Sequence, residues 1–166
     1  MNKIFQFIIF CFFLVNANFV NAKENIVFID LNYVLNKSNE GKKILDKLNV
    51  KNDENKKLFN SKESMLEKER DDIKKLKNIV SKDEYNKKVA LFQEKVQLYN
   101  KEKTDIINSF EKSKKKELDI FFKNLNEIMN IYMKENSISI IIDKKNIVMA
   151  AVKNDISNEI IELVNK

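Results

Sequence analysis

Two aspartates are the side chains of this sequence whose spacing is best suited to chemistry. Asp30 and Asp143 each end a short apolar run rich in branched residues, the first at 26–29 and the second at 138–142. If the two runs pair in a sheet, their carboxylates come close enough to hold a metal ion or to act as an acid and a base. The alternative is that each acid caps the turn after a strand, which is the commoner use of such residues and the one we favour.

The remaining composition excludes most enzyme classes. The chain has no histidine, one cysteine (Cys11) and one glycine (Gly41). Phosphate-binding loops need several glycines, and nucleophilic or zinc sites usually need histidine or cysteine. We therefore expect a protein without catalytic activity, cofactor or metal.

The N-terminus has the features of an export signal. A short basic region precedes an apolar run at 4–15, which is too short to span a bilayer of about 30 Å. Small or branched residues at Val20 and Ala22 fit a cleavage site near Ala22. We therefore expect a signal peptide at 1–22 and an exported mature chain without Cys11.

Residues 41–135 predict a long helical hairpin. The stretch has no proline, and its apolar residues recur at steps of three and four. Ser81 and Glu84 form a capping box that starts a second helix after Val80. The two helices then run antiparallel, with residue i facing about residue 165 − i. Each reaches roughly 60 Å, and the second extends about eleven residues further, into a base.

The two predicted helices have different seams. The first carries polar residues at Asn52, Asn55, Lys62 and Glu69, so we expect residues 49–72 to be loosely held and flexible. The returning seam is richer and more aromatic, with steps of four at 110–118 that place Lys114 in it. Its aromatics include Tyr99 and Phe110, which either fill the seam or contact a bound partner. The residues that we name as candidate partner contacts are Phe122, Tyr99 and Phe110.

Charge is unevenly distributed along the chain. Residues 42–124 carry 23 basic and 16 acidic side chains, whereas the rest of the mature chain carries 7 basic and 9 acidic. A positive arm suits acidic partners or an anionic surface, although a lysine-rich tip can also be merely solvated. Export and interspersed acids argue against nucleic acid. The candidate anionic-surface contacts near the turn are Lys74, Lys75, Lys77, Lys82, Lys87 and Lys88.

We predict three short strands in the base, at 26–30, 138–143 and 147–151. The last two are expected to form a hairpin, and Asp155 is expected to cap a final helix. So small a sheet leaves strand edges and apolar area uncovered, which predicts assembly with other copies. The candidate oligomerisation residues on these strands are Ile26, Phe28, Ile140, Ile142, Ile147 and Met149.

The predicted fold class is therefore α+β, with a long antiparallel α-helical hairpin arm projecting from a small β body formed by oligomerisation. The expected organisation is a signal peptide at 1–22, a body at 23–40 and 125–166, and an arm at 41–124 that turns near 81–84.

The ends of the mature chain resemble the Skp (OmpH-like) family of periplasmic chaperones. The resemblance lies in the segment 26–32, the break at Gly41 and Lys42, the strand segments at 138–143 and 147–151, and Asp155-Ile156-Ser157. It implies a homotrimer whose three arms enclose a cavity for unfolded outer-membrane proteins, without ATP. It also implies contact with lipopolysaccharide or an anionic membrane surface, with no residues assigned.

These observations lead to a periplasmic holdase, a chaperone that keeps unfolded outer-membrane β-barrel proteins from aggregating. The alternative is an exported structural or adaptor coiled coil of the cell envelope.

Overall fold

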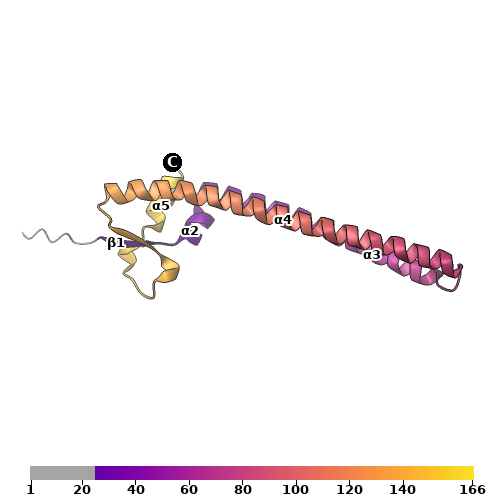
Figure 1. The fold of residues 1–166 in the computed structure, drawn as a ribbon. Coiled ribbons are helices and arrows are strands. Elements are labelled where there is room, and N and C mark those ends of the chain that lie inside the picture. The colour runs from indigo at the N-terminus through magenta and orange to yellow at the C-terminus, as the bar shows by residue number, and fades with distance from the viewer. Residues whose placement is uncertain (1–24) are drawn as a thin grey trace, which may run out of the picture.

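The computed structural model of this chain describes residues 25–166, so the predicted signal peptide, its cleavage site and Cys11 lie outside the described residues. A long helical hairpin projects from a small base that contains the strands and the C-terminus (Figure 1). The predicted α+β class with a helical arm is confirmed.

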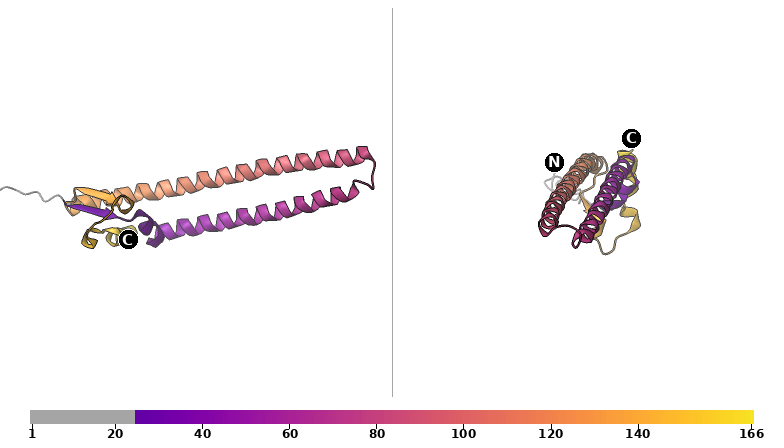
Figure 2. Two further views of the ribbon diagram at one scale, coloured as in Figure 1. Left: turned by 90° about the horizontal axis from the view of Figure 1, so that it is seen from below. Right: turned by 90° about the vertical axis from the view of Figure 1, so that its right-hand side faces the viewer.

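The arm consists of α3 (Asn39–Leu76) and α4 (Lys82–Glu135). Each begins at a serine cap: Ser38 Oγ accepts from the Gly41 amide at 3.2 Å, and Ser81 Oγ accepts from the Glu84 amide at 3.3 Å. The predicted cap at Ser81 is confirmed, but α3 ends at Leu76 rather than at Val80, so the turn occupies 77–81. The two helices run side by side, and α4 continues past the start of α3 into the base (Figure 2).

The sheet has two parallel strands, β1 (Ile26–Ile29) and β2 (Ile140–Asp143), with Ile26 opposite Ile140 and Ile29 opposite Asp143. A parallel pair needs a long crossover connection, and here the whole arm provides it. The predicted strands at 26–30 and 138–143 are therefore largely confirmed.

The predicted third strand and its hairpin are wrong for the single chain. Within the described residues, 147–151 belong to no strand. The 3₁₀ turn η1 (Lys144–Asn146) directs the chain away from β2, and the Ile147 amide bonds the Lys144 carbonyl at 3.1 Å instead of a strand. β1 already pairs with β2 and bridges to Asp155, and η1 follows β2 in place of a hairpin turn. The second edge of β2 therefore stays unpaired within the described residues.

The segment 155–157 joins β1 to the last helix, α5 (Ser157–Val164), just after the 3₁₀ turn η2 (Val152–Asn154). The Ile156 amide donates to the Phe28 carbonyl at 3.0 Å, and the Asp30 amide donates to Ser157 Oγ at 2.8 Å. Asp155 accepts from the Ser157 amide at 3.0 Å. The N-cap of α5 is Ile156, so the predicted cap residue, Asp155, lies one residue before the observed cap.

Asp30 and Asp143, the two aspartates considered for a metal or acid–base site, both cap turns. Asp30 accepts from the Tyr33 amide at 2.9 Å at the start of α2 (Leu31–Lys37), and Asp143 accepts from the Lys145 amide at 3.2 Å. The Lys145 side chain also hydrogen-bonds Asp143 and lowers the pKa of that carboxyl. Among residues 25–166, no three metal-ligating side chains cluster. Turn capping, the interpretation favoured from the sequence, is confirmed.

One hydrophobic core joins the base to the root of the arm. Its most completely buried apolar side chains come from β1, α2, α4 and α5, and Ile44 and Leu48 of α3 belong to the same cluster, so the base and the hairpin share one core. The most completely buried residues are Phe121, Ile29, Leu125, Ile160 and Val34.

Gly41 lies where α2 meets the first turn of α3. A Cβ atom added there would stand 1.9 Å from the Leu35 carbonyl oxygen and 2.8 Å from Ser38 Oγ. Only a residue without a side chain permits this approach, because the first of these neighbours is backbone and cannot rotate away.

We predict that Gly41→Ala lowers the free energy of unfolding by roughly 1–3 kcal/mol, the usual cost of overpacking a well-packed site. Chemical denaturation followed by circular dichroism measures it. Asn49→Ala, at an exposed position of the same helix, is the control and should change little. Equal stability of the Gly41 variant and the wild type would contradict the close approach.

Candidate functional site

Ion pairs across the arm fix how its helices face each other. Lys47 pairs with Glu117, Lys62 with Glu102 and Lys95 with Glu69, each at 2.5 Å. The residue numbers of each pair add to 164, so the predicted facing rule of about 165 − i is confirmed.

The packing between the helices weakens away from the base. Leu48 of α3 and Phe121 and Leu125 of α4 are buried at the root of the arm. Beyond them, the first helix places Asn52 and Asn55 in the seam, as predicted, and both lie at least partly buried. Lys114 is exposed, so its predicted seam position is wrong. The two steps of four around it turn its side chain out of the interface.

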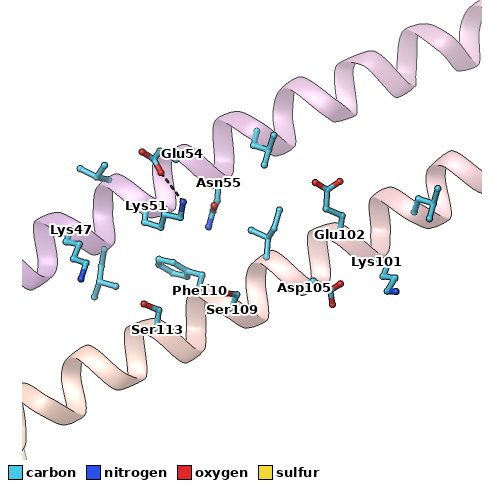
Figure 3. A pocket seen from close by; sticks show the side chains of 15 residues that line it. Lys47, Lys51, Glu54, Asn55, Lys101, Glu102, Asp105, Ser109, Phe110 and Ser113 are labelled. Carbon is cyan, nitrogen blue, oxygen red and sulfur yellow. Dashed lines mark hydrogen bonds and ion pairs between the residues drawn. The ribbon is translucent and has the colours of Figure 1, made fainter.

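A hollow of about 910 Å³ opens between the helices where the seam is polar (Figure 3). Leu48, Ile106 and Phe110 supply apolar surface to it, and Asn55 points from α3 into the space between the helices (Figure 3). Ser109 and Ser113 face it from α4. The hollow therefore exists because small and polar side chains meet where a regular coiled coil would place large apolar ones.

Apolar side chains continue along the same face toward the tip. Two further hollows, of about 690 and 330 Å³, share Leu98 with the first one and share Met65 with each other. Leu58, Met65, Leu91 and Leu98 line this series and are 38–69% exposed. We call these four residues the apolar strip. They form exposed apolar surface without a partner in the described chain, the usual mark of an interaction site.

The charged residues around the largest hollow balance. Three lysines and three acids line it, and Lys51 pairs with Glu54 at 3.2 Å. The net positive charge predicted for the arm is therefore not concentrated at this hollow. Electrostatic attraction of acidic partners is a weaker explanation for binding here than apolar contact.

Three polar side chains meet across the middle of the arm. Tyr99 Oη and Lys103 Nζ each donate to Glu63 Oε1 at 2.7 Å, and Lys103 lies 5.3 Å from the centre of the Phe59 ring. The hydrogen bond from Lys103, then that from Tyr99, lowers the pKa of Glu63. The same contact with Glu63 raises the pKa of Lys103. These exposed bonds hold the helices together beyond the largest hollow.

The predicted aromatic contacts lie mainly inside the fold. Tyr99 is half-buried in the seam, where desolvation and Glu63 raise the pKa of its hydroxyl. Phe110 is half-buried in the largest hollow. Phe122 is half-buried with its ring edge against Phe121, at 5.4 Å between centroids. Of the three, Phe110 lines the largest hollow and Tyr99 lines the smallest, whereas Phe122 lines none of the three hollows.

The predicted tip lysines divide into two groups. Lys74, Lys75 and Lys88 pair with acids on their own helices, at 3.4, 2.8 and 3.8 Å. No ion pair within residues 25–166 involves the other three, which are exposed; these are Lys77, Lys82 and Lys87. Their contact with an anionic surface stays a prediction.

The residues predicted for oligomerisation differ in accessibility. Phe28 is 7% exposed, so its side chain is unavailable to another subunit in this conformation. Ile26 and Ile140 are 40% and 45% exposed, and Met149 is 90% exposed. Ile142 and Ile147 are half-buried. Except for Phe28, these residues remain candidates for contact between copies.

The apolar strip was not predicted from the sequence. Its members are not in the seam, but Leu58 and Met65 are seven residues apart on α3, as are Leu91 and Leu98 on α4. A seven-residue repeat outside the seam was the available signal, because such residues share one side of a helix. Val148 and Val152, 103% and 85% exposed, were likewise not singled out.

No helix within 25–166 has the length and apolar composition to cross a membrane.

A family model and a solved structure both relate this chain to OmpH-like proteins. A family model described as outer membrane protein (OmpH-like) matches residues 25–164. A crystal structure of a candidate outer membrane chaperone (OmpH-like) from Caulobacter crescentus superposes with a TM-score of 0.74 at 15% identity, covering 86% of this chain and 84% of that one. At that identity the likeness concerns the fold. No curated protein matches the chain significantly.

We predict that the contact at Glu63 contributes stability only above acidic pH. Because its pKa is lowered in the folded chain, the contribution is complete above its unfolded value of about 4.3 and is lost as the pH falls through the folded value. Denaturation midpoints of wild type and Glu63→Gln should therefore differ slightly at pH 7 and converge near pH 3.

Glu67→Gln is the matched control, since Glu67 pairs with Arg70 on its own helix and not across the arm. A wild-type advantage over Glu63→Gln that persists at pH 3 would contradict the role of the ionised carboxylate.

Proposed function

This chain belongs to the OmpH-like family, and we propose that it is an ATP-independent periplasmic holdase that binds unfolded outer-membrane β-barrel proteins and prevents their aggregation. The apolar strip is the observation that carries the proposal. Leu58, Met65, Leu91 and Leu98 are 38–69% exposed on the arm. A protein that only spaces other components does not require exposed apolar residues of this kind.

The physical properties of the strip suit such clients. The strands of outer-membrane barrels alternate apolar and polar residues, so each segment is only weakly hydrophobic. A row of shallow apolar hollows offers many modest contacts and no single deep pocket. Binding of this kind is tolerant of sequence, and the flexible side chain of Met65 adapts its shape to varied partners.

Assembly is the second part of the proposal. We propose a homotrimer in which the bases associate and three arms surround a cavity. Two observations support contact between copies. The segment that contains Val148, Met149 and Val152 is almost fully exposed and strongly apolar, and β2 pairs with β1 on one side only. An exposed apolar segment and an open strand edge are each sites for contact with another chain.

Export and non-catalytic action complete the proposal. The N-terminal features of the sequence support delivery to the periplasm. Contact of the tip with lipopolysaccharide or anionic lipid, through Lys77, Lys82 and Lys87, belongs to the same proposal. Co-sedimentation with anionic vesicles measures that contact.

The first test is an aggregation assay. An unfolded porin diluted from urea should scatter less light in the presence of the wild-type protein, and Leu58→Asn/Leu98→Asn should lose about half of this protection or more, because exposed apolar area drives the contact. The control is Ile107→Asn, at a residue that is 44% exposed and lines none of the three hollows. Unchanged scattering with wild-type protein would instead favour the structural or adaptor alternative.

The second test concerns assembly. Ile140→Asp/Ile142→Asp should convert the trimer into monomers, because charges on β2 oppose pairing between copies. Native mass spectrometry measures the species, and circular dichroism checks that the helices persist. Ile107→Asp serves as the control on the arm. A wild-type monomer, or a trimer that survives the double substitution, would contradict the proposed body.

A further inference from the structure

Asn55 has an amide that nothing in the described chain satisfies. Asn55 is only 9% exposed, yet its side chain takes part in none of the side-chain hydrogen bonds within residues 25–166, which near it join Lys47 to Glu117 and Lys51 to Glu54. No fully buried side-chain polar atom of these residues lacks a partner, so the amide atoms must retain contact with the hollow. Figure 3 shows the side chain between the two helices, directed into that space.

An asparagine at this seam position gives up packing between the helices. A leucine here would fill the space and bind the helices together, whereas the amide stays in contact with the hollow. Ser109 and Ser113 across the hollow enlarge the space rather than close it. The arrangement therefore favours an open, polar-centred site over tight helix packing.

We propose that this hollow binds an extended segment of an unfolded polypeptide by its main chain, with Asn55 as the hydrogen-bonding group. The inference rests on the proposed function and deepens it by assigning the client-binding residue and the part of the client that it recognises. A carboxamide carries one acceptor oxygen and two N–H donors, so it can pair with the N–H and C=O of one peptide unit. Such pairing is independent of the client's side chains.

The surroundings of Asn55 fit an extended chain. Leu48, Ile106 and Phe110 provide apolar surface for alternate side chains of the segment. The volume of about 910 Å³ falls in the range of small-ligand sites. Leu58 and Leu98 line the same hollow, so a segment held at Asn55 continues onto the apolar strip.

The charges exclude one competing kind of partner. Lysines and acids around the hollow are equal in number, so a strongly acidic or basic peptide gains no net attraction there. The favoured occupant is an uncharged segment of alternating apolar and polar residues, as in outer-membrane strands.

The test uses a pair of peptides with identical side chains. One is a fluorescein-labelled 12-residue peptide of alternating leucine and threonine, and the other has its central amides N-methylated, which removes main-chain donors. Fluorescence anisotropy with the wild-type protein should show the methylated peptide binding about three- to tenfold more weakly, the worth of one or two hydrogen bonds. Equal binding of both peptides would overturn main-chain recognition.

Two variants locate the effect. Asn55→Ala removes the amide and leaves the hollow open, and Asn55→Leu also fills it. Both should bind the two peptides equally, and both should bind the parent peptide more weakly than wild type does. Asn52→Leu is the matched control, because Asn52 is also in the seam of α3 but does not line the hollow. A peptide preference that survives at Asn55→Ala would refute the assignment.

The aggregation assay separates this inference from the proposed function. If wild type protects the porin and both Asn55 variants protect it equally well, the site is wrong while the holdase proposal stands. If wild type gives no protection, the holdase proposal fails, and the inference that rests on it fails with it.

Discussion

The packing at the root of the arm is the contact on which the rest of the structure depends. Phe121 and Leu125 of α4 are buried in one cluster with residues of β1, α2, α3 and α5. The sheet has only two short strands, and a pair of this size is not stable alone. The base is stable because the longer arm helix passes through it, and the arm is oriented because its root belongs to the same core. Gly41 allows this junction by letting α2 and α3 approach closely.

Away from this junction, the arm combines two opposing requirements. Helices that pack tightly through large apolar residues leave little apolar surface exposed for a partner. Helices that pack too loosely do not keep a fixed position relative to each other. The two requirements are met at different positions along the arm. Tyr99 and Lys103 bridge to Glu63 on the outer arm, while small and polar side chains nearer the base leave a hollow. Exposed ion pairs contribute little each, so the outer contacts hold register without making the arm rigid.

This separation changes the functional role of the aromatic residues. Aromatic side chains were the obvious candidates for client contact, but Tyr99 and Phe122 are engaged in the seam and against Phe121. The exposed apolar surface is aliphatic instead. Aliphatic side chains on a charge-balanced face give weak, sequence-tolerant contact, which agrees with the proposed capture of varied unfolded chains.

The sequence by itself determined the local features of this protein. The Ser81 cap, the helical hairpin, its register and the positions of β1 and β2 all follow from short-range patterns, because capping and periodicity act within a few residues. Tertiary structure decided how distant segments meet. The parallel pairing of β1 with β2 depends on the arm, which connects them and brings them together. The segment 147–151 forms no strand because η1 follows β2 in place of a hairpin turn. The hollow at Asn55 depends on which side chains of α4 face it across the arm, and no pattern within one helix specifies that.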